Sequence, residues 1–122
     1  MLRPPPNRGK TNLAISVGEN MAHVGHMLMK TKPGRYAKVS ERYRNFADQV
    51  MAHHADLHDV IIVGDPAQNT VEGFGIWENA AEAATLEDTQ DFASFLAEIE
   101  ADLAHPIERT DLQLLYRYRP RA

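Results

Sequence analysis

Six histidines are the main side chains of this 122-residue sequence whose charge can change near neutral pH. His26 lies in a segment of mixed apolar and polar residues, and His54 lies at the end of a segment with helical periodicity. An imidazole in a dry pocket can act as a general base, so the sequence indicates His26 and His54 as candidate catalytic residues. For His26, a hydrogen-bonded histidine within a sheet is the simpler alternative, because satisfied buried histidines are common.

Metal binding is the second chemistry that the histidines suggest. His53 and His54 are adjacent, and His58 follows four residues after His54. Neighbouring side chains on a helix point about 100° apart, which does not form a chelate, and a helix C-terminus favours the protonated imidazole. No Asp or Glu completes a spacing typical of zinc sites. We therefore expect no metal site here.

Large apolar side chains are candidates for the walls of a substrate-binding pocket, since aromatic faces stack on planar ligands. These candidates are Met27, Met29, Trp77, Phe92 and Phe95. For Phe92 and Phe95, packing in an ordinary core is the alternative. Trp77 differs because Gly73 and Gly75 precede it on the same face of a predicted strand. Small neighbours beside a large side chain indicate a recess.

Composition excludes several function classes. The chain has no cysteine, which excludes disulfides and thiolate chemistry and fits a cytoplasmic location. A formal net charge of −4 disfavours generic binding to nucleic acid or to anionic membranes. The sequence shows no phosphate-binding loop and no nucleophile elbow. No apolar stretch approaches the roughly 20 residues of a membrane helix, and the start of the chain lacks the apolar run of a secretory signal.

Hydrophobic periodicity predicts the strands that position these side chains. We expect strands over residues 23–32, 58–64, 70–77 and 111–119. The second and third form an antiparallel hairpin around the turn at 65–69. The second contains four consecutive β-branched residues, Val60 to Val63, which favours a strand that is covered on both faces and central in its sheet.

The helices follow from apolar residues at spacings of three and four. Residues 36–54 predict an amphipathic helix of about five turns. Asn79, with Glu82 three residues later, is a plausible capping pair for a short helix. Thr89 can cap a second helix, which ends before Pro106.

The order strand, helix, strand, strand, helix, strand is the split βαβ arrangement. It predicts an α+β, ferredoxin-like βαββαβ domain over residues 23–122, with a four-stranded antiparallel sheet and its helices on one face. Residues 1–22 include three consecutive prolines and predict an extended or mobile arm. The sheet face without helices needs a partner if it is apolar, and a chain of this size buries only a modest core. We therefore expect a homodimer.

Three segments in this order resemble the dimeric α/β-barrel superfamily, most closely its antibiotic biosynthesis monooxygenase (ABM)-like branch, over about residues 23–119. They are the turn Lys32-Pro33-Gly34, the strand end Gly75-Ile76-Trp77-Glu78-Asn79 and the helix start Asp88-Thr89-Gln90-Asp91-Phe92. The resemblance implies that two sheets close a dimeric α/β barrel, with a small hydrophobic pocket between each sheet and its helices. It also implies a cofactor-independent monooxygenase acting on a small aromatic or quinol-type compound. The alternative is a noncatalytic small-molecule-binding or structural dimeric module on the same fold.

Two departures from that family bear on the chemistry. Oxygenase-type members often carry a histidine in the short helix after the tryptophan, where this chain has Leu86. Haem-degrading members carry an asparagine on the first strand, where this chain has Met27. Haem degradation is therefore not expected.

The segment 72–77 also superficially resembles the signature of an RNA-recognition motif on the same strand of the same topology. It lacks the residues that bind RNA, because Glu72 replaces a basic residue and Ile76 replaces an aromatic one. The first strand has no aromatic residue on which a second base could stack. The sequence therefore predicts no nucleic-acid partner.

Overall fold

The computed structural model describes residues 22–118 and 120, so the expected N-terminal arm lies outside the described residues except for Ala22. The elements in chain order are β1 (His23–Lys30), α2 (Tyr36–Gln49), β2 (Leu57–Asp65), β3 (Thr70–Trp77), α3 (Ala80–Glu87), α4 (Gln90–Ile99) and β4 (Glu108–Gln113). Short 3₁₀ turns follow α2 and α4, at Met51–His53 and Glu100–Asp102. No helix of the described part of the chain is long and apolar enough to cross a membrane.

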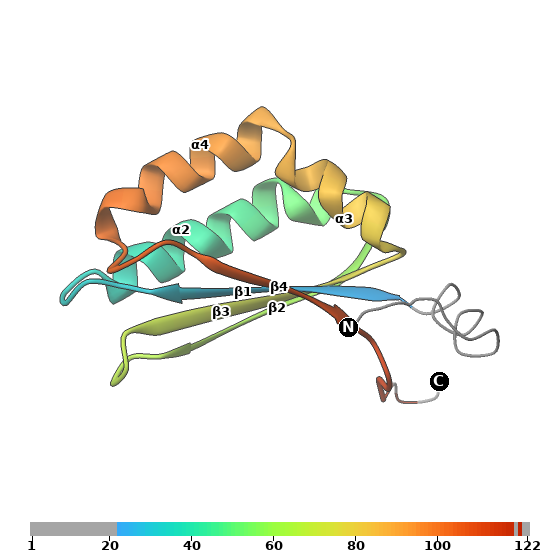
Figure 1. Ribbon diagram of the computed structural model, residues 1–122, viewed down its shortest axis with the longest axis horizontal. Coiled ribbons are helices and arrows are strands. Elements are labelled where there is room, and N and C mark those ends of the chain that lie inside the picture. Colours follow the sequence, from blue (N-terminus) through green and yellow to red (C-terminus); the bar gives the residue numbers. More distant parts are fainter. Residues whose placement is uncertain (1–21, 119, 121–122) are drawn as a thin grey trace, which may run out of the picture.

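The four strands form one antiparallel sheet in the order β2-β3-β1-β4. Figure 1 shows α2, α3 and α4 on the same side of this sheet. This arrangement confirms the predicted α+β, ferredoxin-like fold with helices on one face. Between β3 and β4 the chain forms two helices, α3 and α4, where the βαββαβ pattern has one.

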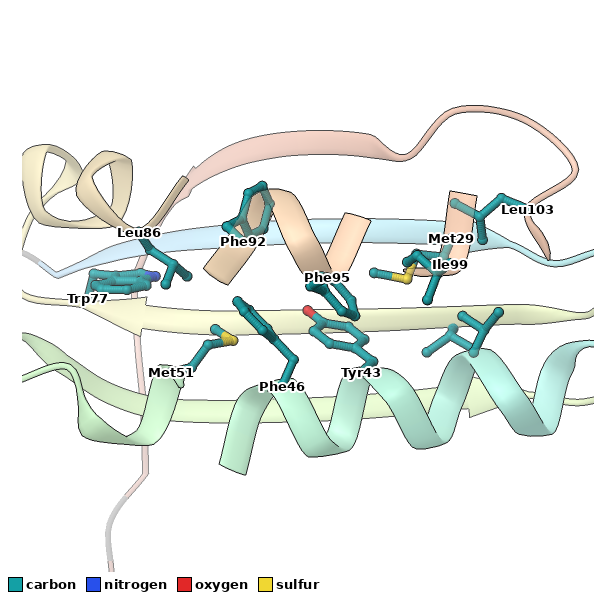
Figure 2. Packing of buried hydrophobic residues seen from close by; sticks show 12 residues of the cluster. Met29, Tyr43, Phe46, Met51, Trp77, Leu86, Phe92, Phe95, Ile99 and Leu103 are labelled. Carbon is teal, nitrogen blue, oxygen red and sulfur yellow. The ribbon is translucent and has the colours of Figure 1, made fainter. Parts of the chain in front are cut away.

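The core fills the space between the sheet and the helices. In α2 the predicted apolar stripe is buried through Val39, Tyr43 and Phe46. The rings of Phe46 and Phe95 stack with their centroids 4.6 Å apart (Figure 2). From the sheet, Met29 reaches the same cluster and is fully buried. The spacings of three and four in the sequence therefore identified the helix faces that pack.

Side-chain caps begin the two later helices, as the sequence predicted. The Oδ1 atom of Asn79 accepts a hydrogen bond from the backbone N–H of Glu82 at 2.9 Å. The Oγ1 atom of Thr89 accepts one from the backbone N–H of Phe92 at 3.1 Å. Each cap satisfies a helix N–H that lacks a partner within the helix, which fixes where α3 and α4 start.

The last strand differs from the expectation over 111–119. β4 starts earlier and ends at Gln113, which pairs with His23 at the first residue of β1. One further hydrogen bond joins Leu114 N–H to Ala22 O at 3.2 Å. β1 begins at His23, and within the described residues the period of two over 114–118 does not produce a strand. This segment passes below the sheet in Figure 1, and Arg117 forms an ion pair with Asp59 of β2.

The prediction that the β-branched run is central in the sheet is wrong. β2 is an edge strand, and the side chains of Ile61 and Val63 are 52% and 46% exposed. β-branched residues favour an extended backbone at any position in a sheet. The central positions belong to β1 and β3, which place glycines opposite one another.

The sheet face away from the helices is called the open face below. Side chains alternate along strands, so the residues that share a face with His26 follow from the strand register. The large apolar side chains of the open face are Val24, Leu28, Ile61, Val63, Phe74, Ile76 and Leu112. The described helices do not pack on this face (Figure 1). The predicted face without helices therefore exists. It carries these apolar side chains beside polar ones such as His26, Glu72 and Glu108, and Val24 and Ile76 are already buried.

Candidate functional site

A small cavity of about 50 Å³ lies between the helix-facing side of β1 and β3 and the three helices. We call it the α3 pocket. Its lining includes Met27, Tyr43, Trp77, Leu86, Phe92 and Asp111. Three of the five predicted substrate-binding residues, Met27, Trp77 and Phe92, therefore line one cavity.

Glycines shape the floor of the α3 pocket. Gly25 of β1 and Gly75 of β3 are paired in register, and the indole of Trp77 lies over them. A Cβ atom at Gly75 would lie 2.9 Å from Trp77 Nε1, and one at Gly25 would lie 3.9 Å from it. One step along β3, a Cβ atom at Gly73 would collide with the phenol of Tyr43. The recess predicted from the glycines is therefore real, and the chain's own aromatic side chains occupy most of it.

The size of the α3 pocket limits what enters without movement. A cavity of about 150 Å³ is needed for benzene, whereas one water takes roughly 10–15 Å³. The observed cavity of about 50 Å³ suits water rather than an aromatic ring. Among the walls, α3 is the least anchored helix, since Leu86 is its one buried residue. Movement of α3 or of the Trp77 indole would enlarge the cavity.

Ionisable side chains surround the mouth of the pocket. Asp111, which lines the cavity, binds His23, with 3.2 Å between His23 Nε2 and Asp111 Oδ1. The His23 side chain is 13% exposed, and His23 pairs in register with Trp77 on the neighbouring strand. Glu87 also lines the cavity and pairs with Arg109 at 2.6 Å. The cavity is thus lined by the carboxylate of Asp111, which is 88% exposed, whereas its partner His23 is not among the lining residues.

The sequence pattern does not indicate these charged residues as part of the pocket. Asp111 was expected at the start of a strand, and Arg109 was expected before it. Since β4 begins at Glu108, both side chains lie on the helix-facing side of the sheet. The register between β1 and β4, which the sequence does not reveal, pairs Asp111 with Gly25 beside the glycine recess.

Tyr43 brings a phenol to the pocket wall from α2. Burial raises the pKa of the Tyr43 hydroxyl well above its ordinary value, because the charged phenolate would lose hydration. The side chain therefore stays neutral and can donate a hydrogen bond, and it cannot act as a base near neutral pH.

The two remaining predicted pocket residues lie deeper in the core. Met29 is fully buried, and Phe95 packs between Tyr43 and Phe46 with ring centroids 5.6 Å and 4.6 Å away. Neither is among the residues that line the α3 pocket. For Phe95, this position matches the alternative of ordinary core packing.

His26 and Met27 point to opposite sides of the sheet. Met27 faces the α3 pocket, whereas His26 lies on the open face. There His26 Nε2 lies 2.9 Å from Glu72 Oε1, and its ring stacks on Phe74 at 4.6 Å. His26 is thus a hydrogen-bonded histidine within the sheet. A catalytic role for it stays a prediction that requires a ligand on the open face.

His54 lies behind Trp77 with its ring edge-on to the indole, at a centroid distance of 4.9 Å. Its Nε2 atom is 3.0 Å from Thr85 Oγ1 on α3. It is not among the residues that line the α3 pocket. His54 instead belongs to a group with Asp56 and Glu82, whose ligand atoms all lie within 4.8 Å of one another. Hydrogen bonding to the Asp56 carboxyl, and the charge of that group, raise the pKa of Glu82.

Comparisons with known proteins identify the fold. No protein-family model matches this chain, and no curated protein matches it in sequence. Solved structures do match it. A protein of unknown function from Nitrosomonas europaea superposes with a TM-score of 0.71 at 17% identity, over 86% of this chain and 100% of that chain. A provisionally named antibiotic biosynthesis monooxygenase from Caulobacter crescentus gives 0.72 at 10% identity, with the same coverage of 86% and 100%.

A second provisionally named antibiotic biosynthesis monooxygenase, from Nitrosomonas europaea, gives a TM-score of 0.71 at 13% identity over 80% of this chain and 93% of that chain. The chain has the ABM-like fold. The resemblance seen in the sequence is therefore confirmed for the fold. Because the identities to these three structures are between 10% and 17%, the chemistry of this chain must be argued from its own pocket.

Proposed function

We propose that this protein oxidises a small aromatic or quinol-type compound with molecular oxygen, as a cofactor-independent monooxygenase using the α3 pocket. The observation that carries the proposal is an aromatic-lined cavity whose lining includes Asp111, the ion-pair partner of His23. The names of the structures that share the fold support the same reaction class.

The reaction balances without a cofactor. A phenol and one O₂ give a quinone and one water, so a ring C–H carbon becomes a carbonyl. The substrate supplies the electrons, one oxygen atom enters the product and the other leaves as water. The protein must remove the phenolic proton and hold the electron-rich anion beside oxygen in a place from which bulk water is excluded.

The pocket residues match these tasks. Asp111 supplies a carboxylate at the cavity, and the imidazole of its partner His23 is the candidate general base. Trp77 and Phe92 supply aromatic surfaces for a planar ring. The neutral hydroxyl of Tyr43 is a hydrogen-bond donor for developing negative charge on oxygen.

Oxygen uptake tests the proposal. Purified protein is incubated with a panel of phenols, naphthols and hydroquinones, with heat-denatured protein as the control for autoxidation. Labelled ¹⁸O₂ should place one oxygen atom in the product. We expect His23→Gln to lower kcat/KM by roughly 10²–10⁴-fold, the usual contribution of a general base. His53→Gln, which changes an exposed histidine, should leave the rate unchanged.

His26 and His54, the catalytic residues predicted from the sequence, are the alternative candidates for the general base. Loss of uptake in His26→Gln or His54→Gln, with normal uptake in His23→Gln, would overturn the assignment of the base. No enzyme-dependent uptake with any member of the panel would overturn the proposed reaction.

A noncatalytic small-molecule-binding module is the second candidate, since the same apolar lining can hold a ligand without any reaction. Trp77 is the single tryptophan of the chain and lines the cavity. Its fluorescence therefore reports directly on occupancy of the pocket. Saturable quenching by an aromatic ligand without oxygen uptake would favour this candidate over the oxygenase.

We also propose that the protein works as a homodimer through the open face. Ile61, Val63 and Leu112 are 52%, 46% and 42% exposed on this face, and exposed apolar patches of this kind mark interaction sites. The polar side chains of His26 and Glu72 on the same face already contact each other. A second copy brings the same surface and would bury these apolar side chains.

Analytical ultracentrifugation tests the dimer. The wild-type protein should sediment as a dimer at micromolar concentration, and Ile61→Lys should sediment as a monomer with an unchanged circular dichroism spectrum. Lys38→Ala, on α2 and away from the open face, is the control. A wild-type protein that remains monomeric at micromolar concentration would contradict this proposal.

A further inference from the structure

We propose that His54, Asp56 and Glu82 bind one divalent transition-metal ion, which ties α3 to the loop before β2. Their ligand atoms lie within 4.8 Å of one another, and all three side chains are partly buried. The two segments that supply them are far apart in the sequence. The sequence predicts no metal site, because no Asp or Glu stands at a typical ligand spacing from these histidines and spacing along the chain does not place Glu82 beside His54.

The tautomer of His54 follows from its neighbours. The Thr85 hydroxyl has one proton, which it donates to the backbone carbonyl of Glu82 at 2.6 Å. Towards His54 Nε2, at 3.0 Å, the same hydroxyl must therefore accept, so Nε2 carries the ring proton. This leaves the electron pair of neutral His54 on Nδ1. A ligating histidine typically donates its other ring N–H in this way, which fixes the ring orientation.

The Nδ1 atom of His54 is directed towards Asp56. It accepts a long hydrogen bond of 3.4 Å from the backbone N–H of Asp56. A metal–nitrogen bond is much stronger than a hydrogen bond of this length. Metal binding can therefore replace this contact with only a small movement of the ring.

The backbone holds the two carboxylates together. Glu78 N–H donates to Asp56 O at 2.8 Å, and Asn79 Oδ1 accepts from Glu82 N–H at 2.9 Å. These bonds join the start of α3 to the loop that carries Asp56. Two like charges in such proximity repel each other, and a divalent cation between them would turn this repulsion into attraction.

The donor set indicates the class of metal. One imidazole nitrogen and two carboxylate oxygens suit a borderline ion such as Zn²⁺, whereas Ca²⁺ and Mg²⁺ prefer sites built from oxygen alone. Three protein ligands leave one position of a tetrahedral ion for water. The ion would lie beside the α3 pocket, because the His54 ring contacts the Trp77 indole. Since α3 has one buried residue, Leu86, a metal bond from Glu82 would anchor it further.

Metal binding by the full-length, chelator-treated protein tests the proposal without any activity assay, so the outcome is independent of the proposed oxygenase function. Isothermal titration with ZnCl₂ should show one ion per chain, and Tm should rise with Zn²⁺ concentration because the ion binds the folded state. Titrations with CaCl₂ and MgCl₂ should show much weaker binding. The variants Glu82→Gln and His54→Gln should each lower Zn²⁺ affinity by at least tenfold.

Matched controls separate the site from general charge effects. Glu78→Gln removes the same charge from a carboxylate that pairs with His58 at 2.9 Å, and His53→Gln removes a neighbouring imidazole. Both should bind Zn²⁺ like the wild type. Melting curves without metal verify that each variant folds. Absence of Zn²⁺ binding by the wild type, or equal binding by Glu82→Gln and Glu78→Gln, would overturn the proposal.

Thr85 provides a second test as a positioning residue. Thr85→Val removes the acceptor for the ring N–H of His54 and should lower Zn²⁺ affinity by roughly 10-fold or more, as outer-shell changes do. Thr85→Ser keeps the hydroxyl and should restore the affinity. Equal affinity in the Val and Ser variants would contradict the tautomer assignment.

Discussion

The two faces of the sheet differ in how their apolar side chains are covered. On the helix-covered face, Met29 and Val71 are fully buried. On the open face, Ile61 and Val63 are about half exposed although they belong to the most β-branched run of the chain. Alternation along a strand delivers apolar residues to both faces, but α2, α3 and α4 all pack on one. An apolar strand pattern therefore shows which side chains favour burial. It does not show which part of the fold buries them.

Glycines sharpen this difference. On the covered face, Gly73 and Gly75 admit the rings of Tyr43 and Trp77 close to the backbone. The same strand presents Glu72, Phe74 and Ile76 on the open face. The covered face is thus closely packed by the chain's own aromatic side chains. The described helices do not pack on the open face.

The largest expected effect is loss of a core ring. Phe95→Ala should lower the free energy of unfolding by about 3–5 kcal/mol, because it leaves a cavity between Phe46 and Tyr43. Urea unfolding measures this change. Leu115→Ala, at a side chain that is 75% exposed, should change stability by less than about 0.5 kcal/mol. Similar costs for the two variants would contradict the packing described here.

The next effect compares two glycines on the covered face. Gly73→Ala should cost about 1–3 kcal/mol, because the added methyl group overlaps the buried phenol of Tyr43. Gly25→Ala should cost little, since its methyl group would meet Trp77 Nε1 at 3.9 Å. Urea unfolding of both variants gives the comparison. The double variant Gly73→Ala with Tyr43→Phe should recover part of the loss, and no recovery would show that the hydroxyl is not the obstacle.

A pH-dependent effect comes from Asp102, behind the start of α2. A hydrogen bond from Lys38, at 2.9 Å, holds the pKa of the Asp102 carboxyl below its ordinary value, and the Arg35 charge acts in the same direction. A lowered pKa stabilises the fold above the ordinary carboxyl value of about 3.9, and this contribution is lost as the pH falls through the lower folded value. Asp102→Asn should therefore flatten the decline of Tm below about pH 4. An unchanged acid limb would contradict this ion pair.

The smallest effect is on the open face. Ile61→Thr should change the free energy of unfolding by about 0.5 kcal/mol at nanomolar protein concentration, where the side chain stays exposed. The proposed dimer predicts that the cost grows at high micromolar concentration, because a second copy would stabilise the folded wild type. Fluorescence-detected unfolding at both concentrations makes the measurement. The cost of Phe95→Ala should not vary with concentration, and a cost for Ile61→Thr that also does not vary would argue against the dimer.

Local patterns predicted most of the fold because they act over a few residues. The capping roles of Asn79 and Thr89, and the antiparallel hairpin over 58–77, are confirmed. The errors concern relations between distant segments. The place of β2 at the sheet edge depends on which strands pair, and the end of β4 depends on where β1 begins.

The candidate site was predicted in part for the same reason. The glycines beside Trp77 indicated a recess, and the structure places Met27 and Phe92 around the cavity there. The sequence does not indicate the pair His23–Asp111, because the two residues lie on different strands. Their contact depends on how β1 and β4 align, and the sequence pattern does not reveal that alignment. Sequence spacing likewise could not bring Glu82 to His54.

The sequence by itself determined the order of helices and strands, the helix caps and the apolar faces, because each depends on side-chain periodicity and on hydrogen bonds between near neighbours. Only the tertiary structure decided which strand lies at the edge, that Met27 rather than His26 faces the cavity, and which carboxylate meets which histidine. These outcomes depend on strand register and on the packing of segments far apart in the chain. A shift of one residue in register would reverse every side chain of a strand.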